Sequence, residues 1–179
     1  MKKIILIFGM PGTGKTTLAK LLSCETGYRF LSSEMIRSKM LNVNKVSEDC
    51  DFTIEEQDMV YEKMLLDAKR ILLKCDGVIL EGVFRSKKQR RIIYNLKQKI
   101  IDVKFYTFYI ICDRKVAIER VRKRKEGVTI SPAGVKTYNA IERIFESPNK
   151  NEKVMIINNT DNIKYSFENI KKALNYSEC

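Results

Sequence analysis

The nine residues GMPGTGKTT, at positions 9 to 17, constrain the fold of this chain more than any other segment. They match the pattern G-x-x-x-x-G-K-[ST] at each fixed position, which here holds Gly9, Gly14, Lys15 and Thr16. Glycines at these positions permit positive φ angles and let backbone N–H groups approach an anion. The preceding KKIILIFG predicts a buried strand, and the following KTTLAKLLSCETG predicts an amphipathic helix. A glycine-rich loop between such a strand and such a helix is typical of a phosphate-binding loop, or P-loop.

Two residues of this loop are candidates for the chemistry itself. Lys15 is expected to reach the outer phosphates of a nucleotide as a catalytic residue, and the Thr16 hydroxyl is expected to bind Mg²⁺. The ring of backbone N–H groups, continued by the start of the next helix, suits the phosphates of ATP. The predicted nucleotide contacts in the loop are Gly9, Met10, Pro11, Gly12, Thr13, Gly14, Lys15, Thr16 and Thr17.

The rest of the chain alternates between strand-like and helix-like segments. Further strands are predicted at residues 28–33, 78–81, 103–112 and 153–158, and further helices at 54–74, 86–100, 114–125, 134–146 and 163–176. This alternation indicates right-handed βαβ units on a parallel sheet. We therefore predict an α/β fold, a P-loop NTPase three-layer sandwich with a five-stranded parallel sheet and helices on both faces. No repeat or linker divides the 179 residues, so residues 1–179 are predicted to form one domain.

The composition excludes several classes of protein. The chain has no histidine, which rules out Ser-His-Asp chemistry and the usual histidine zinc sites. Its five cysteines lack C-x-x-C spacing and are expected to be free thiols in a reducing compartment. The apolar run at the amino terminus leads into the phosphate loop and not into a signal-peptide cleavage site, and no segment is long enough to span a bilayer. We expect a cytoplasmic monomer with no membrane partner.

The segment SSEMIR provides the first acidic candidate beyond the loop. Glu34 follows the second predicted strand, where an acceptor substrate would approach the γ-phosphate, and Arg37 lies three residues later on the same side of a helix. A carboxylate there can take the proton of an acceptor hydroxyl, and an arginine can hold an acceptor phosphate or steady the carboxylate. The alternative is that Ser33 caps the helix and Glu34 only favours its first turn.

The second acidic candidate is Glu81, which ends the apolar run VIL. P-loop enzymes place an acid at the end of such a strand to orient Mg²⁺ or its water shell. An acid at this position is also common because strands end at solvent. We favour the metal role, because the P-loop already requires a metal partner nearby.

A basic helix at residues 114–125 provides the third candidate. Arg120 and Arg124 are one helical turn apart, and a break at Gly127 follows them. This pattern predicts a lid, at about residues 120–136, whose two arginines close over the phosphates as catalytic residues. Arg120 is also a predicted nucleotide contact. Most of the individual lysines in the helix are interpreted as a solvated basic face.

Taken together, these segments resemble a known group of kinases. ILIFGMPGTGKTTLAKLL, LSSEMIR, MVYEKMLLDAKRILLKCDGVILEGVFRSKKQR and ICDRKVAIERVRKR follow one another as in the P-loop kinases of the AAA-type kinase-like family. That family is close to polynucleotide 5′-kinases, zeta toxins and chloramphenicol phosphotransferase. The resemblance implies an ATP- and Mg²⁺-dependent kinase that transfers the γ-phosphate to a hydroxyl or phosphate acceptor.

The resemblance also assigns roles to individual positions. Glu34 falls where these kinases usually carry an aspartate base, and Glu81 falls where they usually carry an aspartate at a strand end. Both acids are therefore longer than the usual residue by one methylene group. The remaining matching positions are Lys15 and Thr16 at the phosphates and Mg²⁺, Arg37 after the base, Arg90 in the helix after the third strand, and Arg120 and Arg124 in the lid.

The acceptor is less constrained by the sequence. The net charge of +12 and the run RSKKQRR at 85–91 favour an anionic acceptor, with a nucleic-acid 5′-hydroxyl or a nucleotide slightly preferred. A nucleoside, sugar or antibiotic hydroxyl stays open, because the chain shows no recognisable nucleic-acid-binding module.

A non-catalytic nucleotide switch is the second class of hypothesis. The segment NNTDN at 158–162 lacks the lysine of a guanine-binding N-K-x-D motif. We interpret it as a loop that touches adenine through its backbone, with Asn159 as a predicted nucleotide contact. Phosphoryl transfer from ATP is therefore the favoured function.

Overall fold

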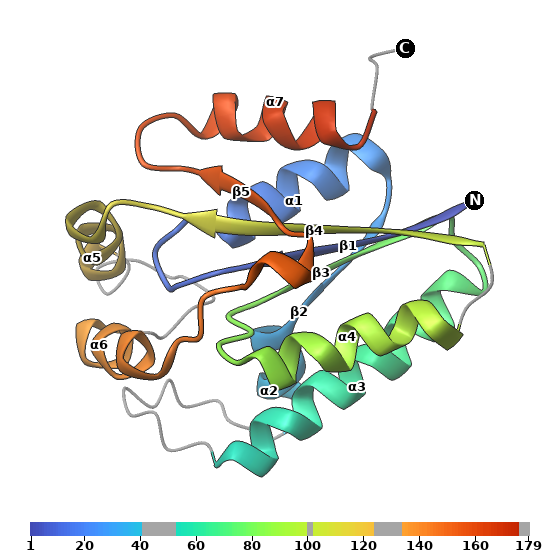
Figure 1. The fold of residues 1–179 in the computed structure, drawn as a ribbon, viewed down its shortest axis with the longest axis horizontal. Coiled ribbons are helices and arrows are strands. Elements are labelled where there is room, and N and C mark those ends of the chain that lie inside the picture. Colours follow the sequence, from blue (N-terminus) through green and yellow to red (C-terminus); the bar gives the residue numbers. More distant parts are fainter. Residues whose placement is uncertain (41–52, 100–101, 124–133, 176–179) are drawn as a thin grey trace.

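The computed structural model describes residues 1–40, 53–99, 102–123 and 134–175 (Figure 1). In this part of the chain, a five-stranded sheet has the order β2-β3-β1-β4-β5, and each neighbouring pair is parallel. Because all strands run the same way, their carboxyl ends meet at one edge of the sheet. The strands are β1 (Lys2–Phe8), β2 (Arg29–Ser32), β3 (Gly77–Gly82), β4 (Val103–Ile111) and β5 (Met155–Asn158).

Helices cover both faces of this sheet. Figure 1 shows α1 (Lys15–Thr26) and α7 (Ile163–Ala173) on one face, and α3 (Ile54–Leu72) and α4 (Lys87–Lys99) on the other. The short α2 (Ser33–Met40) directly follows β2. Beyond the carboxyl ends of β4 and β5 lie α5 (Arg114–Lys123) and α6 (Val135–Ile144), and a 3₁₀ turn at Lys150–Glu152 precedes β5.

The central strand β1 explains why the core divides into two halves. Side chains alternate between the faces of a strand, so Ile5 and Ile7 point to one helical layer, and Ile4, Leu6 and Phe8 point to the other. The first two pack in a cluster with residues of α1 and α7, and the other three pack in a cluster with residues of α3 and α4. All five are fully buried, which is why the segment reads as one uninterrupted apolar run.

The predicted fold class is confirmed: the chain has a five-stranded parallel sheet between two helical layers. The predicted strands and helices agree with the observed ones apart from their ends. Part of the predicted lid, residues 124–133, lies outside the described residues, and so do residues 41–52 between α2 and α3. The single-domain assignment stays a prediction. Among the described residues, no helix is both long and apolar enough to cross a membrane.

Candidate active site

The phosphate loop connects the carboxyl end of β1 to the amino terminus of α1. Gly9 has φ 147°, and a Cβ atom there would lie 2.3 Å from the carbonyl oxygen of Ile110 in β4. Gly14 has φ 89° and caps α1, and a Cβ atom there would lie 2.2 Å from the Asn159 amide nitrogen. These glycines therefore meet both a conformational and a steric requirement. The predicted contacts from Gly9 to Thr17 all lie at the sheet edge where the strands end.

Lys15 is folded back over the loop. Its ammonium group donates to the carbonyl oxygen of Met10 at 2.8 Å, and its side chain is mostly buried. The Thr13 hydroxyl donates to the same carbonyl at 2.9 Å. These contacts link the two ends of the loop around the place where phosphates would lie. The assignment of Lys15 to the phosphates stays a prediction.

Thr16 and Glu81 meet at the start of α1. The Thr16 hydroxyl donates to the Glu81 carboxylate at 3.3 Å, and Glu81 is 5 % exposed. Residue Ile7 pairs with Glu81 across the β1–β3 ladder, so adjacent strands bring the loop and the acid together. One hydroxyl and one carboxylate fit Mg²⁺, which usually binds one or two protein oxygens together with water and substrate phosphates. Among the described residues, no group of three or more His, Cys, Asp or Glu side chains forms a denser metal site.

Glu34 and Arg37 lie on α2, one strand away from Glu81. Ser32 pairs with Glu81 in the β2–β3 ladder, so α2 begins beside the predicted metal site. The Arg37 guanidinium lies 3.9 Å from the Glu34 carboxylate, and both side chains are partly buried. The two predicted acceptor residues are therefore brought together as an ion pair. Glu34 also lies in the first turn of α2, so its role as a base stays a prediction.

The loop between β3 and α4 carries an arginine that the sequence analysis counted within a basic run but did not single out as a site residue. Arg85 follows Phe84, whose N–H donates to the Tyr61 hydroxyl of α3 at 3.1 Å. Burial raises the pKa of Tyr61 to about 12, while the charges of Arg37 and Arg85 act in the opposite direction. Both positive charges therefore act on the same hydroxyl. The segment EGVFR contained this signal, because an arginine four residues after the strand-end acid lies at the same sheet edge.

Arg90, which the resemblance placed among the kinase arginines, is fully buried below this loop. Its guanidinium donates to both carboxylate oxygens of Glu152, at 2.6 and 3.0 Å. It also donates to the carbonyl oxygens of Phe84 at 3.0 Å and Glu146 at 2.9 Å. The structure thus gives Arg90 four contacts within the protein, which tie the loop after β3 to the segment after α6.

On the nucleotide side, Arg120 of α5 contacts the loop after β5. Its guanidinium donates to the carbonyl oxygens of Asn159 and Thr160, each at 2.8 Å, and lies 3.4 Å from the Cys112 sulfur. Asn159 is 1 % exposed, and its side-chain amide donates to Thr13 O at 2.8 Å. The backbone N–H of Asn159 donates to Ile111 O at 2.9 Å. The N–H and the amide of Asn159 are thus engaged within the protein, and its contact with adenine stays a prediction.

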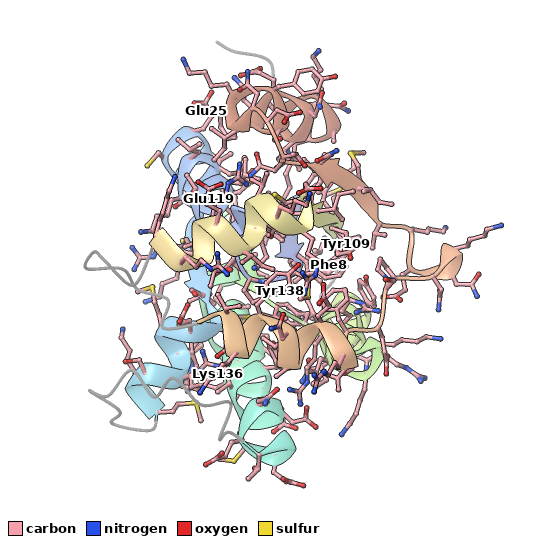
Figure 2. The ribbon with its side chains drawn as sticks, turned by 90° about the vertical axis from the view of Figure 1, so that its left-hand side faces the viewer. Phe8, Glu25, Tyr109, Glu119, Lys136 and Tyr138 are labelled. Carbon is pink, nitrogen blue, oxygen red and sulfur yellow. The ribbon has the colours of Figure 1, made fainter. Side chains whose placement is uncertain are left out.

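The predicted lid is described only in part. Figure 2 looks onto the end of the molecule where α5 and α6 lie, and Tyr138 of α6 lies between the two helices. Tyr138 packs there with Ala117 and Val121 of α5. Phe8 and Tyr109 lie side by side in the same view, with their rings stacked at 5.0 Å. Arg124 lies outside the described residues, so the lid roles of Arg120 and Arg124 stay predictions.

Comparisons with known proteins agree with this geometry. A family model described as an AAA domain matches residues 5–161. The chain is 33% identical over 132 residues to an adenylate kinase of Prochlorococcus marinus strain AS9601, which covers 70% of this chain and 72% of that protein. It is 24% identical over 157 residues to an adenylate kinase of Nautilia profundicola, and the match covers 84% of this chain and 80% of that protein.

Solved structures show the same fold at lower identity. A sugar kinase from Janibacter sp. HTCC2649 aligns with a TM-score of 0.78 and 16% identity, covering 99% of this chain and 96% of that one. The APS kinase of Mycobacterium tuberculosis, solved with AMPPNP and APS, aligns with a TM-score of 0.71 and 14% identity, covering 97% and 98%.

The fold, the phosphate loop and the relatives define a P-loop kinase, an ATP-dependent phosphotransferase. Because the family model spans most of the sequence, the chain belongs to the AAA domain family.

Proposed function

We propose that this kinase uses ATP and Mg²⁺ to phosphorylate an anionic acceptor, either a nucleotide or the 5′ end of a nucleic acid. The observation that carries the proposal is the position of Arg37 and Arg85, which follow the neighbouring strands β2 and β3 at the edge of the sheet where Glu81 lies. Two guanidinium groups at the acceptor side of a phosphate loop favour an acceptor that itself bears phosphate. The named relatives agree with this choice, since they are adenylate kinases.

Each residue then has a defined task in the transfer. Lys15 and the loop N–H groups hold the outer phosphates, and Thr16 and Glu81 would hold Mg²⁺, which neutralises charge as it develops on the transferred group. Arg37 and Arg85 orient the acceptor phosphate. Phosphoryl transfer gains mainly from such positioning and charge neutralisation.

Glu34 has a role that depends on the acceptor atom. If a 5′-hydroxyl attacks, Glu34 accepts its proton as the general base. A phosphate monoester is already largely ionised at neutral pH, because its second pKa is about 6, so it needs no base. In that case Glu34 orients Arg37 through their ion pair. The role of Glu34 therefore differs between the two acceptor classes. It acts as a base in an activity of the polynucleotide-kinase type, and it positions Arg37 in an activity of the adenylate-kinase type.

The test is a transfer screen with γ-labelled ATP and matched acceptors. Each nucleoside is compared with its 5′-monophosphate, and 5′-hydroxyl oligonucleotides are compared with sugars, with the Lys15→Ala variant as the inactive control. We expect label to appear on a nucleotide or an oligonucleotide. Label that appears only on uncharged sugars or nucleosides, or only on inorganic phosphate, would contradict the proposal.

A further inference from the structure

Asn159 is a buried polar residue whose side chain has no task in the mechanism above. It follows β5, it is 1 % exposed, and its amide nitrogen donates to the Thr13 carbonyl oxygen at 2.8 Å. Among the described residues, its amide oxygen is a buried atom without a hydrogen-bond partner. An unpartnered buried oxygen lowers stability, so packing alone does not explain an asparagine at this position. The contact with Thr13, which joins residues 146 positions apart, is what an asparagine adds here.

Neighbouring segments fix the position of this asparagine. Its N–H donates to Ile111 O at 2.9 Å, just beyond the last pair of the β4–β5 ladder. Its carbonyl oxygen accepts a hydrogen bond from Arg120 at 2.8 Å, and Arg120 also donates to Thr160 O at 2.8 Å. The backbone on both sides of the side chain is therefore held, and the amide is a donor in a fixed place.

The phosphate loop leaves room for this amide at Gly14. A Cβ atom there would lie 2.2 Å from the Asn159 amide nitrogen. Gly12 and Gly14 flank Thr13 with φ angles of 79° and 89°, and glycines allow the peptide between Thr13 and Gly14 more than one orientation. The hydrogen bond from Asn159 to the carbonyl oxygen of this peptide selects one of them.

The orientation of this peptide decides where the Gly14 N–H points. In a trans peptide the C=O and N–H bonds lie in one plane and point in opposite directions. Because the Thr13 carbonyl points toward Asn159, the Gly14 N–H points away from it. Within the described part of the chain this N–H has no acceptor, and it lies at the amino terminus of α1, where backbone N–H groups favour an anion. A phosphate oxygen would supply the acceptor.

We propose that Asn159 is a positioning residue of the nucleotide site, which acts through the Thr13 carbonyl to hold the Gly14 N–H in the direction that donates to a phosphate of ATP. The inference rests on the proposed function in that it requires ATP to bind in the phosphate loop. It gives the side chain of Asn159 a task at the phosphates, apart from the predicted contact of this loop with adenine.

The test uses ADP with Mg²⁺, and adenosine, as probes in calorimetric titrations of the wild type, Asn159→Leu and Asn169→Leu. Leucine has nearly the shape of asparagine but neither donates nor accepts a hydrogen bond. Asn169, partly buried on α7, is the matched control. We expect Asn159→Leu to weaken ADP binding by about three- to tenfold, the usual effect of losing one hydrogen bond. Adenosine affinity should not change, because adenosine has no phosphate, and Asn169→Leu should behave as the wild type.

A spectroscopic readout separates positioning from a general loss of structure. In the wild type, the amide proton resonance of Gly14 should move to lower field when ADP and Mg²⁺ bind, because the N–H then donates to a phosphate oxygen. At saturation with ADP, the same resonance should move less in Asn159→Leu, since the Thr13–Gly14 peptide is no longer held in one orientation.

Asn159→Asp adds a dependence on pH that a structural role would not produce. In acid, the protonated carboxyl group can donate to Thr13 O, so the variant should bind ADP more tightly than Asn159→Leu does, each relative to the wild type at the same pH. As the pH rises and the group ionises, the carboxylate repels the same oxygen, and the affinity should fall below that of Asn159→Leu.

Several outcomes would overturn the inference. Equal ADP affinity in the wild type and Asn159→Leu would do so, and so would equal losses of ADP and adenosine affinity. If Asn159→Leu does not fold, the wild type and Asn159→Asp give the answer. A Gly14 amide proton that does not respond to ADP in the wild type, or an Asn159→Asp affinity that follows the wild type at every pH, would refute the positioning role.

The failure of this inference can be told apart from the failure of the proposed function. ADP binding that depends on Asn159, together with transfer of label to no acceptor, leaves the inference standing and refutes the kinase proposal. Transfer of label with an ADP affinity that does not depend on Asn159 has the opposite meaning.

Discussion

The two ends of the active site are held in place by different means. At the nucleotide end, the chain from Gly9 to Thr16 is folded largely by its own glycines and by short-range contacts, such as those of Thr13 and Lys15 with Met10 O. At the acceptor end, Phe84 adopts a left-handed backbone conformation, and side chains from distant parts of the sequence maintain it.

The conformation of the phosphate loop is thus mainly local in origin, whereas the conformation of Phe84 depends on tertiary contacts. A glycine adopts a positive φ without support, so the backbone of the phosphate loop needs no compensation for strain, although Asn159 also donates to Thr13 O. A phenylalanine at φ 44° needs compensation from its surroundings. That compensation comes from Tyr61 on α3 and from Arg90, which is itself held by Glu152. Changes to the contacts that hold Phe84 should therefore lower the stability of the fold, and changes at the nucleotide end should mainly affect turnover.

The largest effect is expected from Glu34→Gln with a hydroxyl acceptor. Removing a positioned base lowers kcat by about 10²–10⁴-fold. ATP affinity should stay nearly unchanged, because Glu34 lies on the acceptor side. Steady-state kinetics and calorimetric ATP binding measure the two quantities, with Glu62→Gln on the exposed surface of α3 as the control. Lost ATP binding with normal turnover of the bound complex would move Glu34 to the nucleotide end.

Glu152→Gln tests the tertiary contacts that hold Phe84, because Glu152 pairs with Arg90. It leaves the buried Arg90 guanidinium without its carboxylate, which usually lowers the free energy of unfolding by about 3–5 kcal/mol. Urea denaturation measures the change. Glu119→Gln, which breaks an exposed pair with Lys123, is the control and should have no measurable effect. A fully stable Glu152→Gln protein would show that the loop after β3 does not depend on this pair.

The same pair predicts how stability depends on pH. Burial raises the pKa of Glu152, but hydrogen bonds from Arg90 and from the Asn149 N–H, with the Arg90 charge, outweigh it and leave the pKa below its ordinary value. The stabilisation is therefore present above the unfolded pKa of about 4.3 and is lost as the pH falls through the lower folded pKa. The stability difference between wild type and Glu152→Gln should shrink over that range. An undiminished difference in acid would contradict the assignment.

Lys15→Ala tests the phosphate loop at the nucleotide end. Loss of one donor that stabilises charge in the transition state usually costs about 10²–10³-fold in turnover. The thermal unfolding temperature should hardly move, because the loop is built by its glycines. Transfer of label from γ-labelled ATP gives the rate, and Lys20→Ala, at an exposed position of α1, is the control. Wild-type turnover in Lys15→Ala would refute the assignment of the loop.

The smallest effect concerns the basic patch formed by Lys87, Lys88 and Arg91 on α4. If the acceptor is an oligonucleotide, neutralising all three should reduce the log–log salt slope of its binding by about 0.9 or less per lost phosphate contact. Lys88 pairs with Asp58 at 2.7 Å, so its share should be the smallest. The matched control neutralises three exposed lysines of the opposite helical layer, Lys20, Lys164 and Lys172. Equal slopes for wild type and patch variant would favour a small acceptor.

The structure brings together the residues that the sequence predicted at the nucleotide end and the pair Glu34 and Arg37, and their roles stay predictions. Gly9 to Thr16 could be predicted because they form a motif of consecutive residues. Glu81 could be predicted because it directly follows the apolar run VIL. Glu34 and Arg37 were found because three residues make nearly one helical turn, and the structure brings them together. The contact of Tyr61 with Phe84 and the burial of Arg90 were not predictable in this way. Tyr61 contacts a residue 23 positions away, and Arg90 pairs with one 62 positions away.

The sequence by itself therefore determined the order of strands and helices, the parallel sheet and the phosphate loop. Each of these depends on periodicity or on backbone freedom within a short segment. The tertiary structure decided which arginine of the basic run is buried and holds the fold. Arg85 and Arg90 lie five residues apart in one basic run, and nothing in that run distinguishes them. Arg85 is only partly buried, whereas Arg90 is fully buried against Glu152, because burial and charge pairing arise only when distant segments pack together.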